Sequence, residues 1–196
     1  TGFFCSTRTI AVSGDSLKSP KYFSTVIGSS ISSLINNDEI NDINNYRFIN
    51  GDPLSGSKVE YSDYIGFYNN CLSVIEEGNN YRMLGWLPFM YNSVPSLSKT
   101  SFSWLLSGAK KVNTNLNGEE RAIVVTGEME KYFPMDIFPM QLIKACIRGD
   151  IEKMESLGIY EVVPEDFGLV DFSCTSKIEA QEIIKSGIQI MLKEVG

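Results

Sequence analysis

The sequence predicts an α+β protein in which a β-rich first half precedes a helical second half. Short runs of alternating or β-branched and aromatic residues recur before residue 94, whereas apolar residues three and four positions apart dominate after Pro134. The 196 residues are 43% hydrophobic and 11% aromatic, which is enough to bury a core, so we expect a folded chain.

The first half is expected to form a sheet with one short helix. Ile31, Leu34 and Ile35 have helical spacing, while residues 36–45 are rich in Asn and Asp without periodicity, which favours a solvated loop over a cation site. A hairpin turn is expected over 76–80. Strands are predicted over 9–13, 22–27, 46–49, 70–75 and 81–86. The order strand, strand, helix, strands is that of a β-grasp (ubiquitin-like) module.

The second half is expected to contain several short helices. Asp136 is predicted to cap a helix that has Pro139 in its first turn and ends at Gly149. Asp150 is predicted to cap a second helix, and Pro164 to open a third.

The last helix carries the strongest periodic pattern. Ser176-x-x-Glu179 matches a capping box, and one apolar stripe follows it, which predicts the core seam of a small helix bundle. The stripe comprises Ala180, Ile183, Ile184, Gly187, Ile188, Met191 and Val195.

Prolines and a Ser-rich stretch suggest three regions along the chain. These are a β-grasp-like domain over 1–94, a connecting segment over 95–133 with an extended run at 121–126, and a helical domain over 134–196.

Composition excludes several kinds of active site. The chain has no histidine, which removes Ser/His/Asp and Cys/His triads, two-His zinc sites and imidazole relays. Its 17 basic and 24 acidic residues give a net charge of −7, and neither half is basic, so nucleic acid is not expected as a partner. No secretory signal and no run of about 18 apolar residues is present, so a membrane-spanning segment is not expected either.

Four cysteines, Cys5, Cys71, Cys146 and Cys174, lie far apart and form no Cys-x-x-Cys motif. Reduced and mostly buried thiols are favoured over a disulfide or a reactive thiol, which in turn favours a cytoplasmic setting.

Three features stand out as candidate sites. The Gly51–Gly56 turn, with Asp52 and Pro53 inside it, is favoured as an ordinary turn, although its backbone could approach a ligand. The adjacent carboxylates Glu76-Glu77 and Glu119-Glu120 are interpreted as turns, because sequence neighbours make poor acid/base pairs. The aromatic belt is favoured as core, with an exposed patch for a partner or a quinone as the alternative; it comprises Tyr81, Trp86, Phe89, Tyr91, Phe102 and Trp104. No catalytic, cofactor-binding or metal-binding residue is assigned.

Several short strings occur in a characteristic order along the chain. They are RxIxVxG at 8–14, INGDPLSG at 49–56, LSVIEEG at 72–78, LGW at 84–86, YFPMDIFP at 132–139, GD at 149–150, LG at 157–158, PEDF at 164–167 and FxCxxK at 172–177. With these strings the chain resembles the C-terminal part of the A subunit family of the bacterial sodium-translocating NADH:quinone oxidoreductases.

The resemblance implies a soluble ligand-binding β-grasp domain followed by a helical domain. It also implies a peripheral position on the cytoplasmic side of the inner membrane, contact with other subunits, and an association with ubiquinone as the substrate of the complex. NADH, flavins and iron–sulfur centres would then lie on other subunits. Related flavin-binding subunits hold a cluster on a Cys-x-x-Cys-x-x-Cys motif, which Cys146 and Cys174 do not form, so no cluster is carried over.

The resemblance covers only the C-terminal part of that family. The family's N-terminal half is missing, and the chain is therefore expected to be a piece of a longer protein. A stand-alone small-molecule binding module remains the alternative, and an autonomous flavoenzyme or iron–sulfur protein a third hypothesis.

Overall fold

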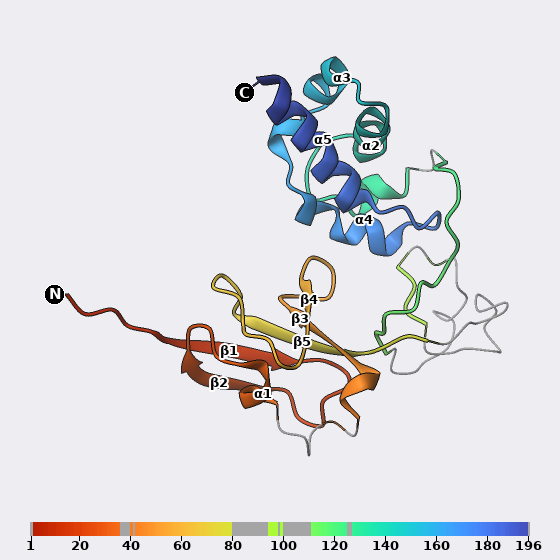
Figure 1. Cartoon of the computed structure of the whole chain (residues 1–196). Helices are drawn as coiled ribbons and strands as arrows, with labels where there is room; N and C mark the ends of the chain where they lie inside the picture. Colours follow the sequence, from red (N-terminus) through yellow and green to blue (C-terminus); the bar gives the residue numbers. More distant parts are fainter. Residues whose placement is uncertain are drawn as a thin grey trace. The chain divides into compact units, whose positions relative to one another are not determined.

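The chain divides into two compact units in the computed structural model, which describes residues 2–35, 40, 42–79, 94–97, 99, 111–124 and 127–195. One unit comprises Thr1–Met83 with Ala109–Asn115, and the other Leu84–Gly108 with Leu116–Gly196. The first unit holds a five-stranded sheet and the second holds helices (Figure 1). The α+β prediction is confirmed, while the boundaries 1–94, 95–133 and 134–196 stay a prediction.

The sheet of the first unit is mixed. Its strands are β1 (Thr7–Ser13), β2 (Lys21–Val26), β3 (Tyr46–Asn50), β4 (Ser57–Val59) and β5 (Cys71–Glu76), in the spatial order β2-β1-β5-β3-β4. The first strand runs parallel to the last, with Ala11 opposite Cys71, and the other neighbours are antiparallel. The central strand β5 buries four successive residues, Leu72 to Ile75, and has a paired strand on each side.

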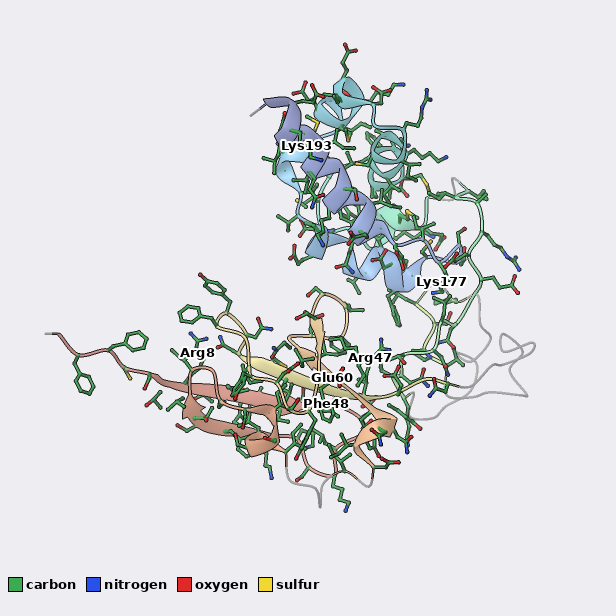
Figure 2. The ribbon with its side chains drawn as sticks, viewed as in Figure 1. Arg8, Arg47, Phe48, Glu60, Lys177 and Lys193 are labelled. Carbon is green, nitrogen blue, oxygen red and sulfur yellow. The ribbon has the colours of Figure 1, made fainter. Side chains whose placement is uncertain are left out.

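The core of the first unit lies between the sheet and helix α1 (Ile31–Leu34). Ile10 and Val12 alternate inward from β1, as the period of two requires, and pack with Ile31 and Leu34 of the helix. Phe48 of β3, labelled in Figure 2, joins this cluster. Its ring centroid lies 5.7 Å from that of Tyr61. The predicted helix is thus present, although only four residues long.

Several expectations for the first unit need correction. Strand β4 was not predicted, because three residues after a turn carry too little periodic pattern. Residues 43–45 form a 3-10 helix, η2 (Ile43–Asn45), within the stretch predicted as a loop, and Ile40 in that stretch is buried. Glu76 is the last residue of β5 and not part of a turn. The predicted strand at 81–86 lies outside the described residues.

The helical unit follows the predicted order. It contains α2 (Pro139–Arg148), α3 (Ile151–Ser156), α4 (Gly168–Ser173) and α5 (Ala180–Val195), with 3-10 helices η4 (Met129–Lys131), η5 (Ile159–Glu161) and η6 (Pro164–Phe167). Pro139 opens α2, and Gly149 ends it in the left-handed conformation at φ 64°. Asp150 caps α3 by accepting a bond from the Lys153 N–H at 3.3 Å.

Two predicted caps are wrong. The N-cap of α2 is Phe138, so Asp136 lies too far upstream to cap it. Helix α5 begins at Ala180, which leaves Ser176 outside the helix, where its hydroxyl donates to the Ala122 carbonyl. A carboxylate from α4 replaces the expected capping box: Asp171 accepts bonds from the Ala180 N–H at 2.6 Å and the Gln181 N–H at 3.3 Å. This cap is tertiary and carries no local sequence pattern.

The core of the helical unit surrounds α5. Ala180, Ile184 and Met191 of the predicted stripe are buried against α2 and the short helices. Within the described residues, no helix is long and apolar enough to cross a membrane. The predicted extended run is described only over 121–124, which forms no strand but is held to the segment between α4 and α5 by a bond from the Arg121 N–H to the Ser176 carbonyl.

Candidate ligand-binding site

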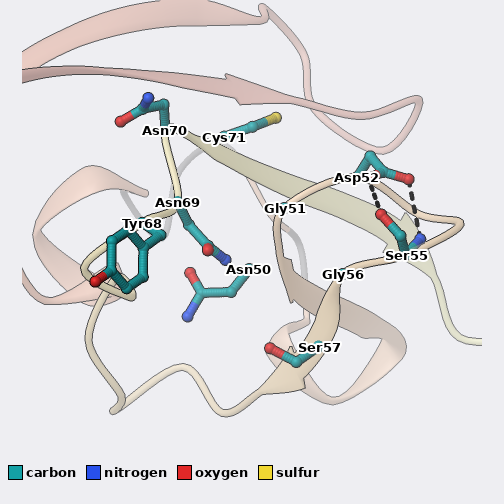
Figure 3. Close-up of a pocket in the computed structure, with 10 residues that line it drawn as sticks. All are labelled: Asn50, Gly51, Asp52, Ser55, Gly56, Ser57, Tyr68, Asn69, Asn70 and Cys71. Atoms are coloured by element: carbon teal, nitrogen blue, oxygen red, sulfur yellow. Dashed lines mark hydrogen bonds between the residues drawn. The ribbon is translucent and has the colours of Figure 1, made fainter. Parts of the chain in front are cut away.

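A pocket of about 490 Å³ lies beside the Gly51–Gly56 turn (Figure 3). It is lined by residues 50–52, 55–57 and 68–71, which belong to the end of β3, the start of β4 and the segment that leads into β5. The antiparallel pairing of β3 with β5 places these segments together, since one strand ends where the other begins. The Gly51–Gly56 turn and residues 68–71, which are separate in the sequence, thus form one concave surface.

The turn is built by Asp52. Its Oδ1 accepts bonds from the Leu54 N–H at 2.8 Å and the Ser55 N–H at 3.0 Å, and its Oδ2 accepts from the Ser55 hydroxyl. Burial raises the pKa of Asp52, but the bonds from Ser55 and Leu54 outweigh burial and hold the pKa below its usual value. The carboxylate is therefore charged at neutral pH, and it accepts hydrogen bonds from other residues of the turn.

The backbone geometry of the turn requires glycine at both Gly51 and Gly56. Gly51 adopts φ 105°, where side chains other than that of glycine are strained. Gly56 sits so close to the backbone that an added Cβ would lie 2.5 Å from the Asp52 carbonyl oxygen. The interpretation of this string as a turn is thus supported by its geometry, and the pocket is an additional property of the same residues.

Asn50 ends β3 at the floor of the pocket. Its side chain is buried, and its Nδ2 donates to the Tyr64 carbonyl at 3.2 Å. The other amide atom, Oδ1, is buried without a hydrogen-bond partner among the described residues. Sequence reasoning missed this residue; the available signal was an amide that directly follows the apolar pair Phe48-Ile49, where a buried polar group needs a partner.

One exposed aromatic residue, Tyr68, lines the pocket. Tyr68 is 89% exposed and stacks edge to face on Phe67 with ring centroids 5.0 Å apart. Arg8 of β1 lies 5.5 Å from the centre of the Phe67 ring (Figure 2) and donates to the Phe67 carbonyl. These contacts anchor the segment that carries Tyr68 to the sheet. The predicted aromatic belt, in contrast, lies outside the described residues.

The paired carboxylates have structural roles. The guanidinium of Arg47 binds both oxygens of Glu77, and the Thr114 hydroxyl donates to Glu77 Oε1 at 3.0 Å. The bond from Arg47, helped by Thr114, holds the pKa of Glu77 below its usual value despite some burial. Glu119 forms an exposed ion pair with Arg121 at 2.6 Å. Neither pair has the arrangement of an acid/base couple.

All four cysteines are free, but they differ in burial. Cys146 and Cys174 are buried, whereas Cys5 is exposed and Cys71 is partly exposed at the pocket, so the expectation of mostly buried thiols holds for half of them. Burial raises the pKa of the Cys146 thiol to about 11. No group of three His, Cys, Asp or Glu side chains that could hold a metal occurs within the described part of the chain.

A second charged cluster lies in the helical unit. Burial lowers the pKa of Lys177, against the attraction of Cys174 and Asp171. The ammonium donates to the Phe172 carbonyl at 3.3 Å, and the alkyl stem packs on Gly118. Burial also raises the pKa of Asp171. Lys177 and Asp171 thus connect residues 116–124 and α4 to the start of α5, and their role is structural.

The fold and the pocket together define the class of protein: a two-unit α+β chain with an open polar pocket on its sheet unit and no complete catalytic set among the residues described. Residues 9–61 match the model of the family described as the NQRA C-terminal domain. The chain is related, over nearly its whole length, to the A subunits of the Na(+)-translocating NADH-quinone reductases.

Three relatives document this. The A subunit of Neisseria meningitidis serogroup C is 34% identical over 199 residues, which cover 99% of this chain and 43% of the relative. The A subunit of Pasteurella multocida is 35% identical over 200 residues, and that of Haemophilus influenzae strain PittGG is 34% identical over 195 residues, with the same coverage. The chain spans less than half the length of these relatives. The resemblance predicted from the ordered strings is confirmed.

Proposed function

We propose that this chain serves as part of the A subunit of a sodium-translocating NADH:quinone reductase, where it docks on other subunits and associates with quinone without performing catalysis by itself. The observation that carries the proposal is the identity of 34% over 99% of the chain with the A subunit of Neisseria meningitidis. An alignment over both units supports a shared fold and a shared place in the complex.

We assign NADH oxidation, the flavins and the iron–sulfur centres to other subunits, with ubiquinone as the substrate of the complex. The surroundings of the buried cysteines support this assignment. Cys146 and Cys174 belong to the apolar core of the helical unit. Burial there raises the pKa of Cys146 to about 11, as expected of a structural thiol.

We further propose that the sheet unit is a β-grasp domain of the soluble ligand-binding type and that the chain lies peripherally on the cytoplasmic side of the membrane. The order β2-β1-β5-β3-β4, with the first and last strands adjacent and parallel, and the helix on one face support the fold assignment. The net charge of −7 favours docking on protein subunits, because acidic lipid head groups repel an acidic surface.

The test removes this region from the A subunit in the purified complex. We expect loss of assembly or of coupled quinone reduction, while NADH oxidation with an artificial acceptor persists in the flavin-containing part. Reintroduction of the region as a separate chain serves as the control for non-specific damage. Full assembly and quinone reduction at the wild-type rate after removal would contradict the proposal.

The second candidate is a stand-alone module that binds a small molecule. The specific observation in its favour is the pocket of about 490 Å³ at the Gly51–Gly56 turn, a volume within the usual range of roughly 300–1,000 Å³ for ligand sites. A ligand that binds only the folded state raises the melting temperature. We expect such a rise with at least one compound of a panel that includes quinones and nucleotides, and an unchanged melting temperature throughout would eliminate this candidate.

A further inference from the structure

The buried amide of Asn50 has one atom, Oδ1, that accepts no hydrogen bond from the described residues. Asn50 is 6% exposed, and its Nδ2 donates to the Tyr64 carbonyl. Because a carbonyl can only accept, this bond determines which way the amide faces and leaves Oδ1 as the unused atom. Buried acceptors are normally satisfied by protein, water or ligand, so the unpaired Oδ1 indicates where a donor belongs.

Asn69 lines the pocket next to Asn50. A Cβ placed on Gly66 would lie 3.5 Å from Asn69 Cγ and 3.7 Å from Asn50 Nδ2, which puts the two amides beside each other. Figure 3 shows both side chains between Tyr68 and the turn. Because Oδ1 is buried, a ligand donor reaches it only after a neighbouring side chain moves, and the partly buried Asn69 is the neighbour that lines the pocket.

The charges around the pocket select an uncharged ligand. Asp52 is the one acidic residue in the lining, and no Lys or Arg accompanies it among the described residues there. A lowered pKa keeps that carboxylate negative, which disfavours phosphates and carboxylates. Its oxygens accept three bonds from Leu54 and Ser55, which leaves about one of its roughly four acceptor sites for a cation.

Tyr68 provides a flat surface for a ring. Its side chain is 89% exposed and stands on the side of the pocket opposite the turn (Figure 3). Rings with a C–H face or a π face pack on an exposed aromatic side chain, while their polar edge remains free for hydrogen bonds. An acceptor at the floor and an aromatic side wall together favour a ring that carries donors on its edge.

We propose that this pocket binds an uncharged ring that carries O–H or N–H donors, one of which bonds Asn50 Oδ1 while a face of the ring packs on Tyr68. Sugar rings and N–H heterocycles share this chemistry. A ring with acceptors alone, such as a dione, does not satisfy Oδ1. The inference rests on the second function proposed above, that the sheet unit binds a small molecule.

The experiment compares compounds that differ only in donors. The whole chain is titrated with cyclohexane-1,4-diol and with cyclohexane-1,4-dione, and the side-chain amide resonances of Asn50 are followed by NMR. Titrations with methyl β-D-glucopyranoside and with uracil show whether the pocket prefers a sugar ring or an N–H heterocycle. We expect the diol and at least one of these two compounds to shift the Asn50 resonances, and the dione to leave them unchanged.

Tyr68→Ala tests the placement of the ring, with Tyr22→Ala as the matched control. Tyr22 is 80% exposed on β2 and does not line the pocket, so both variants should fold. We expect Tyr68→Ala to weaken binding of the ligand about five-fold, the effect of one lost ring contact, and Tyr22→Ala to leave it unchanged.

The outcomes are distinguishable. Equal binding of diol and dione, or equal affinity of the two tyrosine variants, overturns the inference. Binding of a quinone or a charged nucleotide but of no uncharged donor ring overturns the inference and leaves the small-molecule function standing. An absence of binding by every compound overturns both.

Discussion

A close contact between two helices makes Gly187→Ala a sharp test of the packing in the helical unit. Gly187 lies in the apolar stripe of α5, and a Cβ there would be 2.5 Å from Cys146 Sγ, 3.1 Å from Cys146 Cβ and 3.4 Å from Met154 Sδ. In an exposed helix the same replacement is stabilising by about 1 kcal/mol. In a packed core an added methyl group costs about 1–3 kcal/mol. We therefore expect a net destabilisation of up to about 2 kcal/mol.

Ser186, an exposed neighbour in the same helix, supplies the reference. The difference between Ser186→Gly and Ser186→Ala measures the intrinsic preference for Ala, which should favour Ala by about 1 kcal/mol. Urea unfolding followed by far-UV circular dichroism gives the free energy of unfolding of each variant. Subtraction of the reference leaves the cost of packing at position 187 alone.

The contact with Cys146 can be isolated by a double-mutant cycle. Cys146→Ala removes Sγ, so Gly187→Ala should be less destabilising in that background, with a coupling energy of about 1 kcal/mol or more. If Gly187→Ala stabilises the wild type as much as the Ser186 reference, or if the two changes add without coupling, the reasoning about this contact is refuted.

Three further predictions concern the turn, an ion pair and a helix cap. Gly56→Ala should destabilise by more than about 2 kcal/mol through its clash with backbone, whereas Gly28→Ala, at φ 75° with no neighbour within 4 Å, should cost only about 1 kcal/mol; similar thermal shifts would contradict this. Glu77→Gln should cost about 1 kcal/mol at neutral pH. Because the bond from Arg47 places the folded pKa of Glu77 below its ordinary value of 4.5, that contribution is present above pH 4.5 and is lost as the pH falls through the folded pKa; a gap that stays constant down to low pH would argue against it. Asp171→Ala should cost about 1–2 kcal/mol by removing the cap of α5, measured by urea unfolding. Burial raises the folded pKa of Asp171 above its ordinary value of 3.8. The difference in free energy of unfolding between wild type and Asp171→Ala should therefore fall as the pH rises from 3.8 through the folded pKa. A difference that rises over this range would count against the assignment.

Elements with a local cause were predictable. Helix α2 begins at Pro139 and ends at Gly149 because a fixed φ and a left-handed C-cap act within one turn of the chain. The stripe of α5 and the alternation of β1 likewise repeat with the period of the element that they form. The ordered strings indicated the relationship to the A subunits in the same way, since they are properties of the sequence itself.

Features with a tertiary cause were missed or wrong. The cap of α5 comes from Asp171 on another helix, so the local pattern Ser176-x-x-Glu179 indicated the wrong residues. Strand β4 exists because β3 offers it a partner. Asn50 became a candidate site residue only when the fold buried its amide and brought Tyr68 and Asn69 beside it.

The sequence alone determined the fold class, the order of most elements, the absence of histidine chemistry and the relationship to the A subunits, because composition and periodicity are local properties. Only the tertiary structure decided where the pocket lies and which groups face it. A pocket joins segments that are distant in the chain, here the end of β3 and the start of β5, and their proximity follows from strand pairing that leaves no trace in local sequence.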